Sequence, residues 1–163
     1  MTRIGLLSDT HGFLPPQIYT HFKDVDEIWH AGDIGSIEVA DALEKFKPLR
    51  AVWGNIDGHD LRIRYPEQML FRVEDVKILM MHIGGYPPKY NAESKPILKK
   101  YQPHLFICGH SHILKVIPDP ILNVLHINPG ACGKEGWQKV NTLIRFSIDG
   151  DRAKDLEVIE LKK

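Results

Sequence analysis

Short apolar runs that end in glycine or polar residues recur along the chain, and each run predicts a buried strand. In the first half these runs lie at 3–8, 25–32 and 49–55. The segments between them, 15–22 and 36–46, predict helices. In the second helix Ile37, Ala40 and Leu43 are three residues apart, while Ser36 suits its N-cap and Pro48 follows its end. The first half therefore predicts alternating strands and helices.

The second half predicts mainly antiparallel strands. These strands are expected within 70–82, 104–110, 116–130 and 141–161, with one helix at 91–102. Glu74-Asp75 and Asp149-Gly150 each separate two strand-like runs, which is typical of a hairpin turn. This order of elements predicts an α/β (α+β) fold in which two sheets pack face to face with helices outside.

Composition indicates a soluble globular protein. The 163 residues are 43% hydrophobic and 26% charged, without repeats or linkers, so we expect one domain spanning 1–163. The 21 basic and 21 acidic residues balance, which makes broad nucleic-acid binding unattractive. No apolar stretch approaches the length of a membrane helix, and the N-terminus does not resemble a signal peptide. Two isolated cysteines, Cys108 and Cys132, favour a cytoplasmic chain with free thiols.

Polar side chains unsuited to a core recur where the predicted strands end. They are Asp9, His11, Asp33, Asn55, His82, His110 and His112. Strand ends are where rigid folds present catalytic side chains, and these oxygen and nitrogen donors suit Mn, Zn or Fe. Each short motif alone is explained better by an ordinary turn than by a functional site. Five such strand ends together predict a metal site.

The series Asp9-x-His11, Gly32-Asp33, Gly54-Asn55, His82 and Gly109-His110-x-His112 resembles that of the calcineurin-like metallophosphoesterases. The stretches "SDTHG" at 8–12 and "NPG" at 128–130 are similar to the small, single-domain YfcE-type phosphodiesterases. The resemblance extends from about residue 3 to the last hairpin. It implies a four-layer αββα sandwich of two mixed sheets flanked by helices, with a dinuclear metal centre at one edge.

The resemblance also implies how the seven side chains divide between two divalent ions. Asp9, His11 and His112 would hold one ion, and Asp33 would bridge to the second. Asn55, His82 and His110 would complete the second ion. Mn²⁺ is the expected metal, with Zn²⁺, Fe and Ni²⁺ as alternatives.

Two of these residues are also expected to act in catalysis. Asp33 would set the separation of the ions, and Asn55 would direct its amide hydrogens at a phosphoryl oxygen. A hydroxide formed between the two ions would attack phosphorus, so no covalent nucleophile is needed.

Three positions depart from the pattern common in this superfamily. Ile56 replaces a histidine that helps to protonate the leaving group, Gly84 replaces a second histidine, and Ala131 replaces a serine. Asp57, His59 or water are the remaining candidates for the acid.

Other residues near the predicted site are expected to have supporting roles or no role in catalysis. His30 in "WHAGD" is a candidate for support behind the metal ligands. The Gly/Pro-rich loop at 84–90 either lines the substrate entrance with Tyr86, Lys89 and Tyr90 or is simply solvated.

The leading hypothesis is a metal-dependent hydrolase of small phosphoesters, with diesters favoured over monoesters. The alternative is a non-catalytic scaffold on the same fold, which the retromer subunit resembles, although such a relative would be expected to lack some ligands. A nuclease is less attractive because the net charge is zero. A homodimer or homotetramer is compatible with the sequence.

Overall fold

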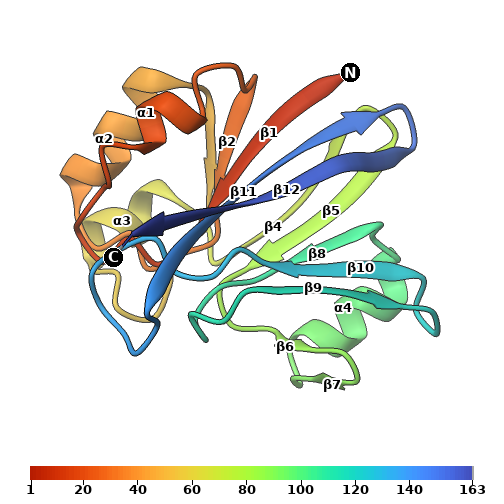
Figure 1. The fold of residues 1–163 in the computed structure, drawn as a ribbon. Coiled ribbons are helices and arrows are strands. Elements are labelled where there is room, and N and C mark those ends of the chain that lie inside the picture. Colours follow the sequence, from red (N-terminus) through yellow and green to blue (C-terminus); the bar gives the residue numbers. More distant parts are fainter. Residues whose placement is uncertain (163) are drawn as a thin grey trace.

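The computed structural model describes residues 1–162, whose strands form two five-stranded sheets and one small hairpin (Figure 1). The first sheet has the order β12-β11-β1-β2-β3. Its strands are β1 (Thr2–Leu7), β2 (Glu27–His30), β3 (Leu49–Ala51), β11 (Val140–Asp149) and β12 (Arg152–Lys162). The second sheet has the order β4-β5-β8-β10-β9. Its strands are β4 (Gln68–Val73), β5 (Val76–Met81), β8 (Leu105–Ile107), β9 (Lys115–Asp119) and β10 (Val124–Asn128).

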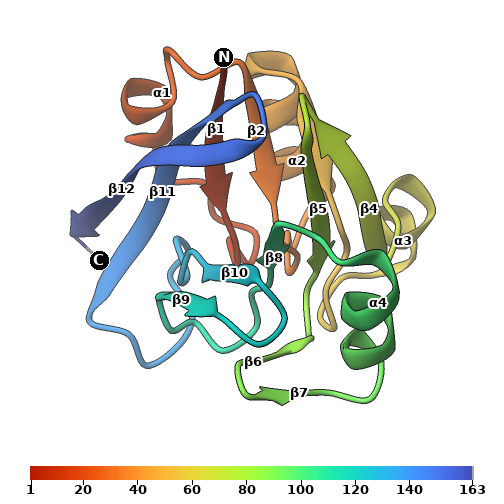
Figure 2. The same cartoon turned by 90° about the vertical axis from the view of Figure 1, so that its right-hand side faces the viewer.

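Helices cover the outer faces of both sheets (Figures 1 and 2). They are α1 (Ile18–His21), α2 (Ile37–Phe46), α3 (His59–Arg64) and α4 (Ser94–Tyr101). Ile18 and Leu43 bring α1 and α2 into one apolar cluster with Ile28 of β2. Leu98 of α4 packs with Phe106 of β8. None of the helices within residues 1–162 has both the length and the apolar character that would let it cross a membrane.

A third apolar cluster lies between the two sheets. Trp29 of β2, Phe146 of β11 and Ile78 of β5 belong to it and are almost fully buried. The order helix, sheet, sheet, helix confirms the expected four-layer αββα sandwich, and parallel pairs inside otherwise antiparallel sheets make both sheets mixed.

Parallel pairing brings the ends of distant strands together. Strands β1, β2 and β3 are parallel neighbours in the first sheet, as are β5, β8 and β10 in the second. Because the carboxyl ends of parallel neighbours lie at the same edge of a sheet, the loops that follow these strands are neighbours too.

The local signals in the sequence correspond to observed contacts. The Ser36 hydroxyl accepts a hydrogen bond from the Val39 amide at 3.3 Å and caps α2, as the sequence predicts. Hairpins form at both predicted turns, with β4 pairing with β5 and β11 pairing with β12.

Three details differ from the sequence prediction. The short helix α3 was not predicted. The predicted loop at 84–90 contains a hairpin of β6 (Gly85–Tyr86) and β7 (Lys89–Tyr90). Strand β3 ends at Ala51, before the predicted boundary, because the Trp53 amide turns away from the sheet to donate to the Pro66 carbonyl.

Candidate metal centre

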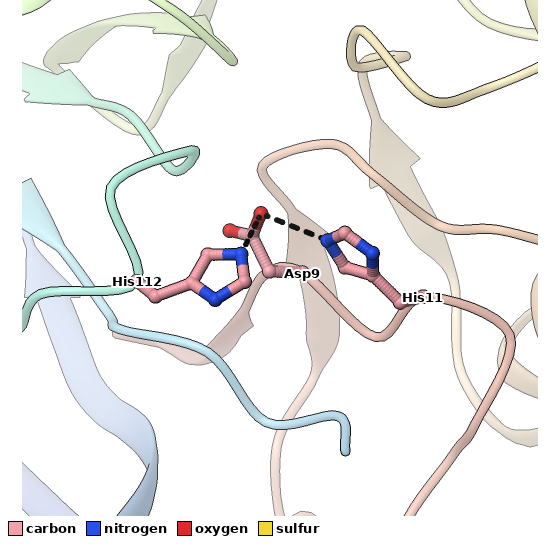
Figure 3. Close-up of side chains that lie close together, drawn as sticks. All are labelled: Asp9, His11 and His112. Carbon is pink, nitrogen blue, oxygen red and sulfur yellow. Dashed lines mark ion pairs between the residues drawn. The ribbon is translucent and has the colours of Figure 1, made fainter. Parts of the chain in front are cut away.

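Six of the seven predicted ligands form two compact groups at the shared sheet edge. One group is Asp9, His11 and His112, and the other is Asp33, His82 and His110. Within each group the potential ligand atoms all lie within 4.8 Å of one another. Figure 3 shows the first group, in which both imidazoles approach the Asp9 carboxylate.

The seventh predicted ligand, Asn55, follows β3 and lies beside the second group. Its side-chain Oδ1 is 3.0 Å from His110 Nδ1. The loops after β1, β2, β3, β5 and β8 thus bring all seven side chains into one region.

In each aspartate one oxygen is fixed by the protein and the other faces the histidines. Asp9 Oδ2 accepts hydrogen bonds from the Ser8 hydroxyl at 2.6 Å and the His110 amide at 3.1 Å. Asp9 Oδ1 lies 3.2 Å from His112 Nε2 and 3.6 Å from His11 Nε2. This division leaves one oriented lone-pair donor for an ion.

Asp33 is arranged in the same way but reaches both groups. Its Oδ1 accepts a hydrogen bond from the Ile56 amide at 3.1 Å. Its Oδ2 lies 3.1 Å from His82 Nε2 and 3.3 Å from His11 Nε2, although these two histidines belong to different groups. A carboxylate in this position can contact two ions at once.

Acceptor atoms orient two of the imidazoles. His82 Nδ1 lies 2.7 Å from the Ala31 carbonyl oxygen, which can only accept, so Nδ1 carries the hydrogen and Nε2 keeps its lone pair. His112 Nδ1 lies 3.2 Å from Gln138 Oε1, which has the same effect. Gln138 was not among the residues predicted from the sequence.

Three buried atoms in the centre have no hydrogen-bond partner within residues 1–162. They are Asp9 Oδ1, His11 Nε2 and His82 Nε2. A buried polar atom without a partner typically costs about 1–3 kcal/mol. Because all three are metal-donor atoms that face one another, the residues fit bound divalent cations.

The electrostatics of the centre keep both carboxylates ionised. Burial raises the pKa of Asp9, but the nearby imidazoles of His11 and His112 and the charge of His82 outweigh burial, so this pKa lies well below its ordinary value. Burial also raises the pKa of Asp33, but the nearby His82 imidazole outweighs burial and lowers this pKa below its ordinary value.

The same contacts act on two histidines in the opposite direction. Burial lowers the pKa of His82, but Asp33 and Asp9 raise it above its ordinary value. The nearby Asp9 carboxylate raises the pKa of His112 despite partial burial. A bound cation would displace these protons, so metal binding here is coupled to proton release.

Five of the seven candidate ligands have left-handed backbone conformations. Their φ angles are 56° at Asp9, 47° at His11, 57° at Asp33, 72° at His110 and 62° at His112. Residues other than glycine rarely adopt this region, and those that do concentrate at functional sites.

His30 lies behind the ligands, as the sequence interpretation suggested. Its Nδ1 accepts a hydrogen bond from the Gly32 amide at 3.1 Å, and its Nε2 lies 3.0 Å from the Thr10 hydroxyl. Thr10 in turn donates to the Ile34 carbonyl at 2.7 Å. Complete burial lowers the pKa of His30 to about 4, so a neutral imidazole supports the loop that carries Asp33.

Asp57 is buried and connects two ligand loops. Its carboxylate accepts hydrogen bonds from the amides of Ile34, Gly35 and Gly54 at 2.8–3.1 Å. These contacts join the loop after Asp33 to the loop before Asn55. The structure therefore supports a structural role for Asp57 in place of the acid role considered from the sequence.

The other candidates lie apart from the ligand set. His59 begins α3 and lines a surface hollow with Ser36 and Glu38. Tyr90 donates its hydroxyl hydrogen to Asp119, and Tyr86 lies under the Lys115 ammonium group. Neither tyrosine lines a cavity described beside the metal ligands, and the same is true of Lys89.

Two cavities border the ligand set. One has a volume of about 280 Å³ and reaches Asn55 and His82, with Trp53 and Arg62 in its lining. The other has a volume of about 490 Å³ and is lined by His110, Ser111, His112, Ile113, Gly136, Trp137 and Gln138.

Several known proteins resemble this chain over most of its length. Residues 2–151 match the calcineurin-like phosphoesterase superfamily domain. A probable metallophosphoesterase of Methanothermobacter thermautotrophicus is 29% identical, with 96% of this chain and 91% of the relative covered. A phosphodiesterase of Methanocaldococcus jannaschii is 25% identical, covering 80% of this chain and 84% of the relative.

The fold also matches solved structures at low sequence identity. The crystal structure of Vps29 from Chaetomium thermophilum has a TM-score of 0.76 at 13% identity, with both chains fully covered. At this identity the likeness concerns the fold alone. Because the superfamily domain spans nearly all of the sequence, the chain belongs to the calcineurin-like phosphoesterase superfamily.

Proposed function

We propose that the protein hydrolyses phosphodiesters of small substrates with two divalent cations held by the two ligand groups. The position of Asp33 Oδ2, close to His11 Nε2 of one group and His82 Nε2 of the other, carries this proposal. Asp9, His11 and His112 would hold one cation, and Asn55, His82 and His110 the other, with Asp33 shared. Mn²⁺ is the proposed metal, since the donors are oxygen and nitrogen without a thiolate.

The cations would neutralise the phosphoryl oxygens and lower the pKa of a bound water. The protein contributes the ionised carboxylates, imidazoles whose lone pairs are oriented, and the Asn55 amide, which can donate to a phosphoryl oxygen. Ile56 has no proton to give, and Asp57 is engaged by three backbone amides. We therefore expect diesters with acidic leaving alcohols, such as phenols, to react fastest.

A small substrate in the cytoplasm fits the remaining observations. Zero net charge does not favour binding to a long polyanion. Both cysteines are free and buried, which is consistent with a reducing compartment.

The test is hydrolysis of bis(p-nitrophenyl) phosphate with and without added Mn²⁺. We expect Mn²⁺ to stimulate the wild-type protein, and Asp33→Ala and His112→Ala to lower kcat/KM by at least about 100-fold. His21→Ala, which changes a histidine outside both groups, serves as the matched control and should retain activity.

Two results would contradict the proposal. Full activity in both ligand variants would exclude the dinuclear centre. An absence of metal-stimulated hydrolysis in the wild-type protein would favour the non-catalytic scaffold instead.

A further inference from the structure

We propose that the cavity beside His110 and His112 binds a flat aromatic group, such as a nucleobase, on one arm of the substrate. Trp137 would be the stacking surface. This inference rests on the proposed function and specifies the class of phosphodiester involved.

The arrangement of the two cavities suits a substrate with two organic arms. The smaller cavity reaches the ligand set at Asn55 and His82, and the larger one reaches it at His110 and His112. They share no lining residue. A phosphodiester has an organic group on each side of phosphorus, whereas a monoester would use only one cavity.

Trp137 differs from the other two tryptophans in its environment. Trp29 is fully buried in the core, and the guanidinium of Arg62 lies 4.0 Å from the centre of the Trp53 ring. Trp137 is 101% exposed, so its indole contributes almost no buried area to the fold. An exposed indole in a cavity offers a face on which a base can stack.

The loop that carries Trp137 is attached to the metal centre. The Gly133 amide donates to the Asp9 carbonyl at 3.2 Å, and Gln138 Oε1 lies 3.2 Å from His112 Nδ1. Gly136 has a φ of 110°, and a Cβ there would lie 2.3 Å from His112 Nδ1. Trp137 therefore lies between Gly136 and Gln138, which both lie against the candidate ligand His112. These contacts fix the loop beside the site.

The chemistry of the cavity lining also favours an aromatic group next to a phosphate. Ile113 is 58% exposed and adds an apolar surface to a lining that also contains the polar His110 and Ser111. A nucleobase needs such a mixed surface, whereas its attached phosphate would lie toward the histidines.

The test compares two sugar phosphates, one with and one without an aromatic base. Dissociation constants of adenosine monophosphate and ribose 5-phosphate are measured by calorimetry on Mn²⁺-loaded protein. We expect Trp137→Ala to weaken the binding of adenosine monophosphate by about tenfold and the binding of ribose 5-phosphate by less than twofold. Trp137→Phe keeps an aromatic face and should retain most of the affinity.

Two results would overturn the inference. One is an unchanged affinity for adenosine monophosphate in Trp137→Ala. The other is an equal loss for both ligands. If sedimentation shows that Trp137→Ala dissociates a dimer without changing nucleotide affinity, Trp137 is a subunit contact and the inference is wrong.

Failure of this inference can be distinguished from failure of the proposed function. Metal-dependent hydrolysis of bis(p-nitrophenyl) phosphate without a Trp137 effect on nucleotide binding would leave the function intact and remove the aromatic subsite. Selective nucleotide binding without any hydrolysis would support the aromatic subsite and contradict the proposed phosphodiesterase function.

Discussion

At the scale of single residues, the centre depends on side chains that fix other side chains. Asp57 shows this most clearly, because its carboxylate holds the amides of Ile34, Gly35 and Gly54 without contributing to either ligand group. Such contacts determine ligand orientation, and losing one commonly costs 10- to 100-fold in metal affinity or activity.

Asp57→Asn should weaken metal binding about tenfold and lower the free energy of unfolding by about 1–3 kcal/mol, because an amide NH₂ would face backbone donors. Metal titration and urea unfolding measure the two effects. The shape of the pH–rate profile should remain that of the wild-type protein. Loss of its alkaline limb alone, with unchanged metal affinity, would identify Asp57 as the acid after all.

Some residues of the centre could be predicted from the sequence, and others could not. Asp9, Asp33 and His82 directly follow apolar runs, so their residue types and positions predicted a shared edge. Gln138 offered no comparable signal, because its contact with His112 spans 26 residues and depends on the path of the loop after β10.

At the scale of elements, helix α2 begins only a few residues after Asp33. Its N-cap, Ser36, is therefore part of the connection between a candidate ligand and the outer helical layer. The Ser36 hydroxyl satisfies the Val39 amide, which has no partner within the helix.

Ser36→Ala should lower the free energy of unfolding by about 1 kcal/mol, since the capping hydrogen bond is lost. Ser36→Asp, which keeps an acceptor at the cap, should remain close to the wild-type protein. Urea unfolding of metal-free protein provides the measurement, and equal stability of the alanine variant would show that the cap contributes nothing.

Element prediction succeeded where apolar periodicity was strong and failed where elements were short. The runs that became β1 and β5 are mostly apolar, and the run that became β11 mixes apolar and polar residues ahead of a clear Asp149-Gly150 turn. Helix α3 has only six residues and a glycine N-cap without a side-chain bond, so few signals mark it. Asp60 in its first turn and Arg62 and Arg64 in its last turn match the helix dipole and were the available clue.

At the scale of the whole molecule, the alternation of strand and helix was sufficient to predict two packed sheets. The order of strands within each sheet was not, because pairing between β1 and β11 joins segments more than 130 residues apart. In the other sheet, His126 of β10 is almost fully buried and its ring lies beside that of Phe106.

His126 should make the folded state sensitive to acid. Burial and then the charge of Lys115 lower the pKa of His126 to about 4, against about 6.5 in an unfolded chain. Between these values the unfolded chain binds a proton that the folded chain does not, so stability decreases as pH falls. We expect about 2 kcal/mol of loss from this residue between pH 7.5 and pH 5.

Urea unfolding in the presence of a chelator, at a series of pH values, measures this effect. His126→Gln should lose less stability than the wild-type protein over the same range. Parallel curves for the two proteins would show that His126 does not bind its proton preferentially in the unfolded chain.

The left-handed backbone at five candidate ligands has a consequence for how this chain can change. Glycine would occupy those five positions with less strain, so each aspartate or histidine retained there costs folding stability. A related chain that no longer needs to bind metal could become more stable by replacing these five residues with glycine. The side chains that would do the chemistry are thus positions where stability and activity oppose each other.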